Sequence, residues 1–218
     1  MTQHQKSHLD ALSEIRSLME RSSRFISLSG LSGVAAGTFA LIGAALIYVY
    51  FGIVPFEGKS LYYALAPATS KWGMHYLTFL MVNGGLVLIS ALAAGIFFTT
   101  RKARHKGQKI WGPLTQRLLI NLAIPLATGG IFCLALFKHG YVGLMAPATL
   151  IFYGLSLVNA SKYTLNDVRY LGISEILLGL LAMFNLGYGL EFWALGFGVL
   201  HIIYGLLMYF KYEREALA

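Results

Sequence analysis

Six long apolar runs, separated by short polar segments, constrain this chain more than any other feature. Each run approaches the roughly 20 residues that an α-helix needs to cross a hydrocarbon layer about 30 Å thick. The composition agrees, because 57% of the residues are apolar and only 12% are charged, whereas soluble domains average about 25% charged. We therefore predict an all-α, polytopic transmembrane bundle. Its six predicted spans are 25–50, 73–99, 116–137, 141–160, 168–188 and 192–210.

The basic residues predict how the chain is oriented. A formal charge of +8 would suggest a nucleic-acid partner in a soluble protein, but these residues cluster between apolar runs, as membrane topology requires. Of the 17 Lys and Arg, all but Lys59, Lys71 and Lys138 fall on the side that holds both termini. The positive-inside rule then predicts cytoplasmic termini, with the lipid bilayer rather than a nucleic acid as partner.

Three regions follow from this topology. Residues 1–23 form a cytoplasmic N-terminal region, in which apolar residues at helical spacing predict an amphipathic helix over 7–20. Residues 24–212 form the six-helix transmembrane domain, and 213–218 form a short cytoplasmic tail. The longest outer connection, 52–71, contains proline and glycine and is expected to be a loop.

Short internal similarities suggest an ancestral repeat. The odd-numbered spans open with Arg24, Arg117 and Arg169, and the triplet Tyr-Gly-Leu occurs at 153–155 and 204–206. These matches are consistent with three helical hairpins inserted in the same sense. Chance alignment of apolar sequences is the alternative.

The stretch 22–33, Ser-Ser-Arg-Phe-Ile-Ser-Leu-Ser-Gly-Leu-Ser-Gly, resembles the start of a family of uncharacterised six-helix bacterial inner-membrane proteins. The stretches 169–175 and 193–205 are similar to the end of such proteins. The resemblance implies a bacterial inner membrane. It implies no activity, cofactor or site.

Small residues and prolines mark the spans where helices pack closely or bend. Ser29, Gly33 and Gly37 lie four residues apart on one stripe, which favours a close helix contact, within the chain or in a homodimer. Pro125 and Pro147 remove a backbone hydrogen bond from the third and fourth spans. Each could act as a hinge or simply bend a helix in a static bundle.

The most informative ionisable residues are Glu175 and His201. Glu175 follows Arg169 by six residues, or about 9 Å, and His201 precedes Lys211 by ten, or about 15 Å. Both should therefore lie in the inner half of adjacent antiparallel spans and meet, because polar groups in hydrocarbon need partners. The pair predicts a proton or ligand site with Asn121 and Tyr204 as neighbours. The alternatives are a purely structural contact, or a Glu175 side chain that extends toward Arg169 instead.

A second polar group is expected near the outer face. His and carboxylate side chains suit zinc, but their spacing matches no zinc motif, so solvated interface residues are the preferred interpretation and no metal is predicted. The single cysteine, Cys133, is interpreted as a small apolar core residue, and no cofactor motif occurs. The members of this outer group are Glu57, His75, His139 and Glu191.

Two functional hypotheses from different classes remain. The first is a non-enzymatic protein that binds or moves a small molecule or a proton through a cavity among the helices. The alternative is a membrane regulator or sensor subunit that uses 7–20 and the basic segment 101–117 to hold a cytoplasmic or lipid partner. A membrane-embedded enzyme is the third possibility, with no recognisable motif to support it.

Overall fold

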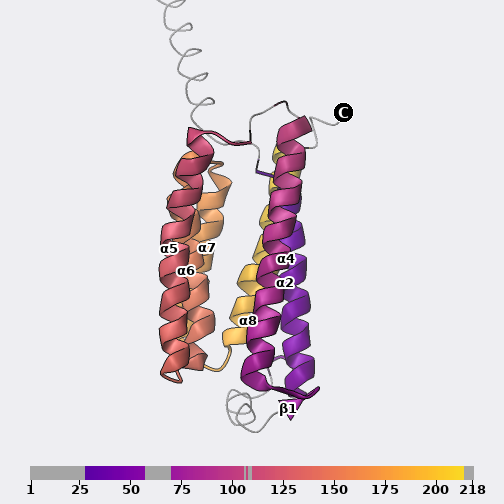
Figure 1. Ribbon diagram of the computed structural model, residues 1–218, viewed down its shortest axis with the longest axis vertical. Helices are drawn as coiled ribbons and strands as arrows, with labels where there is room; N and C mark the ends of the chain where they lie inside the picture. Colours follow the sequence, from indigo (N-terminus) through magenta and orange to yellow (C-terminus); the bar gives the residue numbers. More distant parts are fainter. Residues whose placement is uncertain (1–27, 57–69, 106, 108–109, 214–218) are drawn as a thin grey trace, which may run out of the picture.

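The computed structural model describes residues 28–56, 70–105, 107 and 110–213. This part of the chain is an all-α bundle of six long helical segments that lie side by side (Figure 1). A two-residue β-hairpin, β1 (Ser70–Lys71) and β2 (Met74–His75), precedes the second segment. The segments are α2 (Gly30–Phe51); α4 (Tyr76–His105); α5 (Pro113–Lys138); η2 (Val142–Leu144), α6 (Met145–Ala160) and η3 (Ser161–Tyr163); α7 (Asp167–Phe184); and α8 (Gly189–Trp193), η4 (Ala194–Leu200) and α9 (His201–Tyr212).

The six-span prediction is confirmed at the level of the fold. Five of the described segments are long and apolar enough to cross a membrane. The exception, α7, has 18 residues and carries three charged side chains, Asp167, Arg169 and Glu175. Charged groups are costly in hydrocarbon, so Glu175 in the interior of α7 needs a polar partner on a neighbouring helix. The chain is a multi-pass membrane protein.

The start and end of the second span differ from the prediction. The helix begins at Tyr76 and continues to His105, so residues 101–105 of the predicted basic loop are helical. A hairpin precedes this helix, where the sequence predicted the end of a loop for β1 and the start of the span for β2. It turns through Trp72 and Gly73, which both have positive φ, as a type I′ turn requires. The Tyr50 hydroxyl of α2 donates to the Met74 carbonyl oxygen over 2.6 Å and so ties the hairpin to the bundle.

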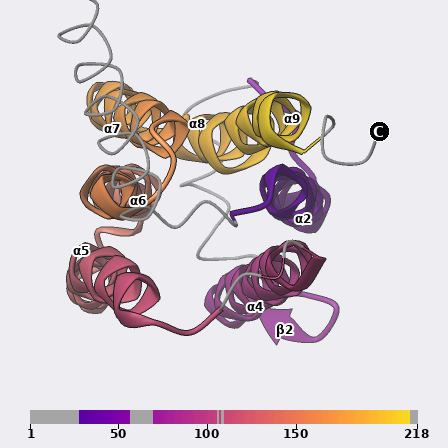
Figure 2. The same cartoon turned by 90° about the horizontal axis from the view of Figure 1, so that it is seen from above.

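The helices form two groups of three (Figure 2). In the first group, α2 packs against α4 and against the last segment, η4 and α9. In the second group, α6 packs between α5 and α7. The last segment also contacts α6 and α7, and we call this junction between the two groups the seam.

Glycines bring α2 and α9 into close contact. A Cβ at Gly205 would lie 2.6 Å from the backbone nitrogen of Val34 and 2.7 Å from the Gly30 carbonyl oxygen. Gly33 and Gly37 face α9 and η4 in the same way. The small-residue stripe of the first span therefore makes a contact within the chain, as the intramolecular hypothesis predicts.

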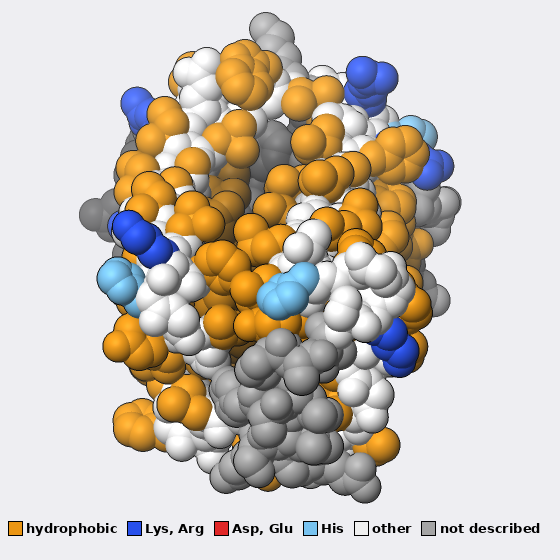
Figure 3. Space-filling view, turned by 60° about the horizontal axis from the view of Figure 1, so that its bottom comes forward, with side chains coloured by type: hydrophobic (Ala, Val, Ile, Leu, Met, Phe, Trp, Pro, Cys, Tyr) orange, Lys and Arg blue, Asp and Glu red, His pale blue; other side chains and the backbone are white. Residues whose placement is uncertain are grey.

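The outer flanks of the bundle are apolar. Exposed Leu, Ile and Phe side chains run along α4 and α5, among them Leu86, Ile96, Ile120 and Ile131, and hydrophobic side chains dominate the face in Figure 3. Such an exposed surface suits contact with lipid. Pro125 lies inside α5, which continues through it.

Successive helices run in opposite directions, so the connections alternate between two ends of the bundle (Figure 1). We call the end with the α4–α5 connection and Glu213 the basic end, and the opposite end, with β1 and β2, the hairpin end. Three parts of the prediction lie outside the described residues: the amphipathic helix 7–20, the residue Glu57, and the tail that follows Glu213. The three-hairpin repeat remains a prediction.

Candidate functional site

Glu175 of α7 and His201, the first residue of α9, meet inside the seam. His201 Nδ1 lies 3.3 Å from Glu175 Oε1. The exposed fraction is 0% for Glu175 and 5% for His201, so the contact is shielded from the surroundings. The predicted meeting of these two residues inside the bundle is confirmed.

Tyr153 of α6 adds a third polar group. Its hydroxyl lies 2.8 Å from His201 Nε2, on the side of the imidazole opposite Glu175. The ring of Phe197 lies 5.0 Å from the Tyr153 ring and 5.8 Å from the imidazole, centroid to centroid. In the sequence Tyr153 stands out only as part of the Tyr-Gly-Leu repeat, because nothing in a linear sequence indicates that α6 faces α9.

The backbone of η4 shapes the space around Glu175. This seven-residue segment is a π-helix, a rare form that often occurs at functional sites. The Gly196 carbonyl oxygen lies 3.0 Å from His201 Nδ1, and a Cβ at Gly196 would lie 2.5 Å from Glu175 Oε2. Glycine at 196 is therefore needed to admit the carboxyl group.

The contacts restrict where protons can lie. A carbonyl oxygen only accepts hydrogen bonds, so the bond to Gly196 places a proton on His201 Nδ1. In a neutral imidazole, Nε2 is then the acceptor for the Tyr153 hydroxyl.

Glu175 differs from His201 and Tyr153, whose polar side-chain atoms have hydrogen-bond partners. Neither of its carboxyl oxygens accepts a hydrogen bond from the described residues. A buried carboxylate without donors costs several kcal/mol. That cost falls if Glu175 is protonated, or if a second proton turns His201 into an imidazolium.

The other two residues predicted for this site, Asn121 and Tyr204, make contacts of a different kind. Asn121 is hydrogen bonded to Asn159, whose Nδ2 donates over 2.9 Å to the Asn121 carbonyl oxygen, and this contact joins α5 to α6. Tyr204 packs against the hydrophobic cluster around Leu157 and Met208. Asn121 therefore supports the packing of α5 on α6, and Tyr204 the packing of the apolar cluster.

The three described members of the predicted outer group lie at the hairpin end and have separate contacts. Glu191 Oε1 accepts the Phe56 backbone N–H over 3.3 Å, His75 packs beside Tyr76, and His139 ends α5. Within the described part of the chain, no three His, Cys, Asp or Glu side chains gather as metal ligands.

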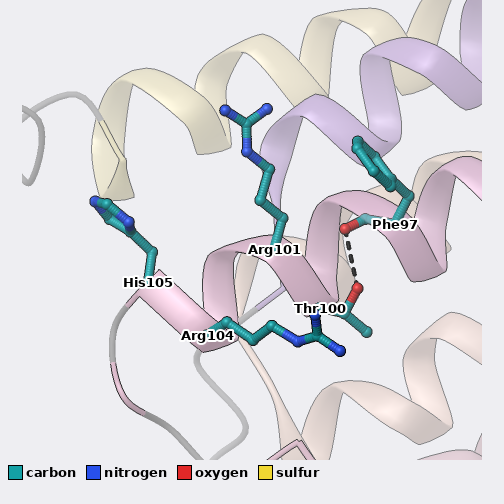
Figure 4. Close-up of a pocket in the computed structure, with 5 residues that line it drawn as sticks. All are labelled: Phe97, Thr100, Arg101, Arg104 and His105. Atoms are coloured by element: carbon teal, nitrogen blue, oxygen red, sulfur yellow. Dashed lines mark hydrogen bonds between the residues drawn. The ribbon is translucent and has the colours of Figure 1, made fainter.

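A concave basic site lies at the other end of the molecule. Its volume is 470 Å³, and the described residues that line it all belong to α4: Phe97, Thr100, Arg101, Arg104 and His105 (Figure 4). The Thr100 hydroxyl donates to the carbonyl oxygens of Ile96 and Phe97. The two arginines are exposed.

Comparisons with models of protein families, with curated proteins and with solved structures gave no match to this chain.

Proposed function

We propose that this protein couples proton binding at Glu175 and His201 to the movement of a small molecule or of the proton itself across the membrane. The observation that carries the proposal is the buried Glu175 carboxyl, which has no hydrogen-bond donor among the described residues and lies 3.3 Å from His201 Nδ1. A merely structural polar pair would be expected to satisfy both carboxyl oxygens.

The net charge of the Glu175–His201 pair changes when it binds or releases a proton, and the proposed function depends on this change. With one exchangeable proton bound, the pair is neutral overall, as a carboxylic acid beside an imidazole or as a carboxylate beside an imidazolium. Release of that proton leaves a negative charge buried among α6, α7 and η4, which is costly. Deprotonation should therefore accompany an opening of the seam that brings water or a cationic ligand to Glu175.

Tyr153 extends the pair by one hydrogen bond. Its hydroxyl donates to Nε2 when the imidazole is neutral and accepts from Nε2–H when the imidazole is charged. The tyrosine can thus follow the protonation state of His201 without leaving its position on α6.

The proposed setting is a bacterial inner membrane with both termini in the cytoplasm. The resemblance of 22–33 to the family of six-helix inner-membrane proteins supports the membrane. The excess of Lys and Arg at the basic end supports the orientation. On this view Glu175 and His201 lie in the cytoplasmic half of the bilayer.

The central test follows the protonation of Glu175 by infrared difference spectroscopy. The protein in lipid vesicles is titrated, and a buried carboxylic acid should give a C=O stretching signal that disappears on deprotonation. The Glu175→Gln variant should lack this signal and remain folded, because the amide keeps the shape of the side chain. Asp167→Asn is the matched control, since Asp167 lies at the basic end in contact with Lys211.

Proton flux gives a second, independent measurement. Vesicles that contain a pH-sensitive dye receive a potassium diffusion potential, and acidification is compared for the wild type, Glu175→Gln and Asp167→Asn. The proposal is wrong if Glu175→Gln leaves both the titration spectrum and the flux as in the wild type. The regulator hypothesis would then be preferred.

A further inference from the structure

The cations at the end of α4 fall into two classes. Lys102 Nζ forms a salt bridge of 3.2 Å with Glu213 and donates to the Leu28 carbonyl oxygen over 2.6 Å. No carboxylate of the described chain forms a salt bridge with Arg101 or Arg104, which lie on the exposed side of the same helix. Lys102 thus has an internal partner, whereas the two arginines are open to an external anion.

Helix length places these arginines at the membrane surface. Residues 76–100 carry no charged side chain and extend about 37 Å at 1.5 Å per residue, somewhat more than the ~30 Å hydrocarbon layer. Arg101 and Arg104 come directly after this stretch, at the depth of the lipid headgroups.

The floor of the basic site is apolar. Phe97 is 58% exposed and lies about one turn deeper than Arg101 and about two turns deeper than Arg104. Ala93 and Leu86 continue the same face of α4 toward the middle of the helix, and both are exposed. A ligand on this face therefore meets cations at one end and hydrocarbon along the rest of its length.

We infer that this face of α4 is a binding site for an anionic phospholipid. Arg101 and Arg104 would contact the phosphate, because the guanidinium group matches phosphate geometry with paired N–H donors. One acyl chain would lie along Phe97 and Ala93. A free phosphate could use the arginines alone, but it would leave the exposed apolar floor without a partner, so the lipid fits the whole site better.

The test compares phosphatidylglycerol with phosphatidylcholine of the same acyl chains, added to the full-length protein in detergent. Native mass spectrometry counts bound lipids, and thermal unfolding reports their effect on stability. We expect phosphatidylglycerol to bind and raise the melting temperature more than phosphatidylcholine. The double variant Arg101→Gln and Arg104→Gln should bind phosphatidylglycerol about tenfold more weakly, since it loses charge-assisted hydrogen bonds.

Two controls make the result specific. Lys138→Gln combined with Lys162→Gln removes the same charge elsewhere and should leave binding unchanged. Phe97→Ala keeps both arginines and should weaken binding of the lipid, with no effect on glycerol phosphate.

Three outcomes would overturn the inference: equal binding of phosphatidylglycerol by the arginine double variant and the wild type, equal effects of the two lipids, or complete competition by inorganic phosphate. The last would identify a soluble anion site. The arginines are exposed, so size-exclusion profiles should confirm that their variants fold.

Discussion

At the scale of single residues, the site depends on a fit between a carboxyl group and a missing side chain. Glu175 occupies the volume that a Cβ at Gly196 would fill, and the carbonyl oxygen of the same glycine orients His201 through Nδ1. Gly196 therefore controls both partners of the pair. This dependence can be tested without changing an ionisable residue.

Gly196→Ala should displace the Glu175 carboxyl from His201, because the new methyl group would lie 2.5 Å from Glu175 Oε2. The same methyl group would also lie 2.6 Å from Leu150 Cδ2. We expect a loss of about 1–3 kcal/mol in stability, typical of an overpacked core. The infrared signal of Glu175 should shift as well. Gly130→Ala in α5 is the control, since its Cβ would meet nothing within 4 Å. An unchanged spectrum in Gly196→Ala would contradict the proposed packing.

Tyr153→Phe should remove the hydrogen bond to His201 Nε2 and keep the ring. The expected loss of stability is about 1 kcal/mol, the usual net value of one hydrogen bond. Thermal unfolding in detergent measures this loss. If Tyr153 follows the protonation of His201, the midpoint of the Glu175 infrared titration should also move. A change in stability with an unmoved midpoint would assign Tyr153 a structural role only.

At the scale of elements, the helices are joined by two kinds of contact. Glycines let α2 and α9 touch backbone to backbone, which strengthens dispersion contacts in lipid, where no hydrophobic effect drives helices together. At the basic end, Glu213 accepts hydrogen bonds from Ser29 Oγ and the Gly30 backbone N–H, and pairs with Lys102. These polar contacts connect the start of α2, the end of α4 and the residue after α9.

Gly205→Ala should separate α2 from α9, because its Cβ would meet backbone atoms of Gly30 and Val34 that cannot rotate away. We expect a stability loss of about 1–3 kcal/mol, measured by thermal unfolding. Gly95→Ala on α4 is the matched control: its Cβ would meet nothing within 4 Å, so its stability should match or slightly exceed the wild type. Equal behaviour of the two variants would count against the close α2–α9 contact.

Glu213→Ala should destabilise the basic end by about 3–5 kcal/mol, the usual cost of removing one partner of a buried ion pair. The side chains of Lys102 and Glu213 are 8% and 11% exposed, so solvent screens the pair only weakly. Combining Glu213→Ala with Lys102→Met should recover part of the loss. Purely additive effects in this double-mutant cycle would show that the two groups are not coupled.

At the scale of the whole molecule, the candidate site lies where the two three-helix groups meet. Tyr153 and Glu175 come from one group and His201 from the other. A movement of the groups against each other would therefore change the surroundings of Glu175 first. Under the proposed function, this placement would connect the protonation of one buried side chain to a relative movement of the two helix groups.

Topology is the prediction that belongs to the whole chain. Reporter fusions after Ala218 and within 101–110 should be cytoplasmic, and fusions within 56–66 should be external, because the excess of Lys and Arg stays on the cytoplasmic side. Alkaline phosphatase and fluorescent-protein activities measure the two locations. An external C-terminus would refute the proposed orientation.

The amino-acid sequence by itself determined the class of fold, the number of helical segments and the meeting of Glu175 with His201. These features follow from local quantities: the length of apolar runs, the rise per residue and the cost of a charge in hydrocarbon. The meeting of Glu175 and His201 could be predicted because the depth of each residue in the membrane follows from its distance along the helix to a cation, Arg169 or Lys211.

Only the tertiary structure decided what surrounds that pair. Tyr153 joins it, while Asn121 bonds to Asn159 and Tyr204 packs with apolar side chains. Which face of α6 meets α9 depends on how the two helix groups dock, and the apolar sequence of a membrane helix carries little directional pattern to predict it. The π-helical turn at 194–200 and the fit of Gly196 to Glu175 likewise arise from contacts between helices, which no local spacing in the sequence encodes.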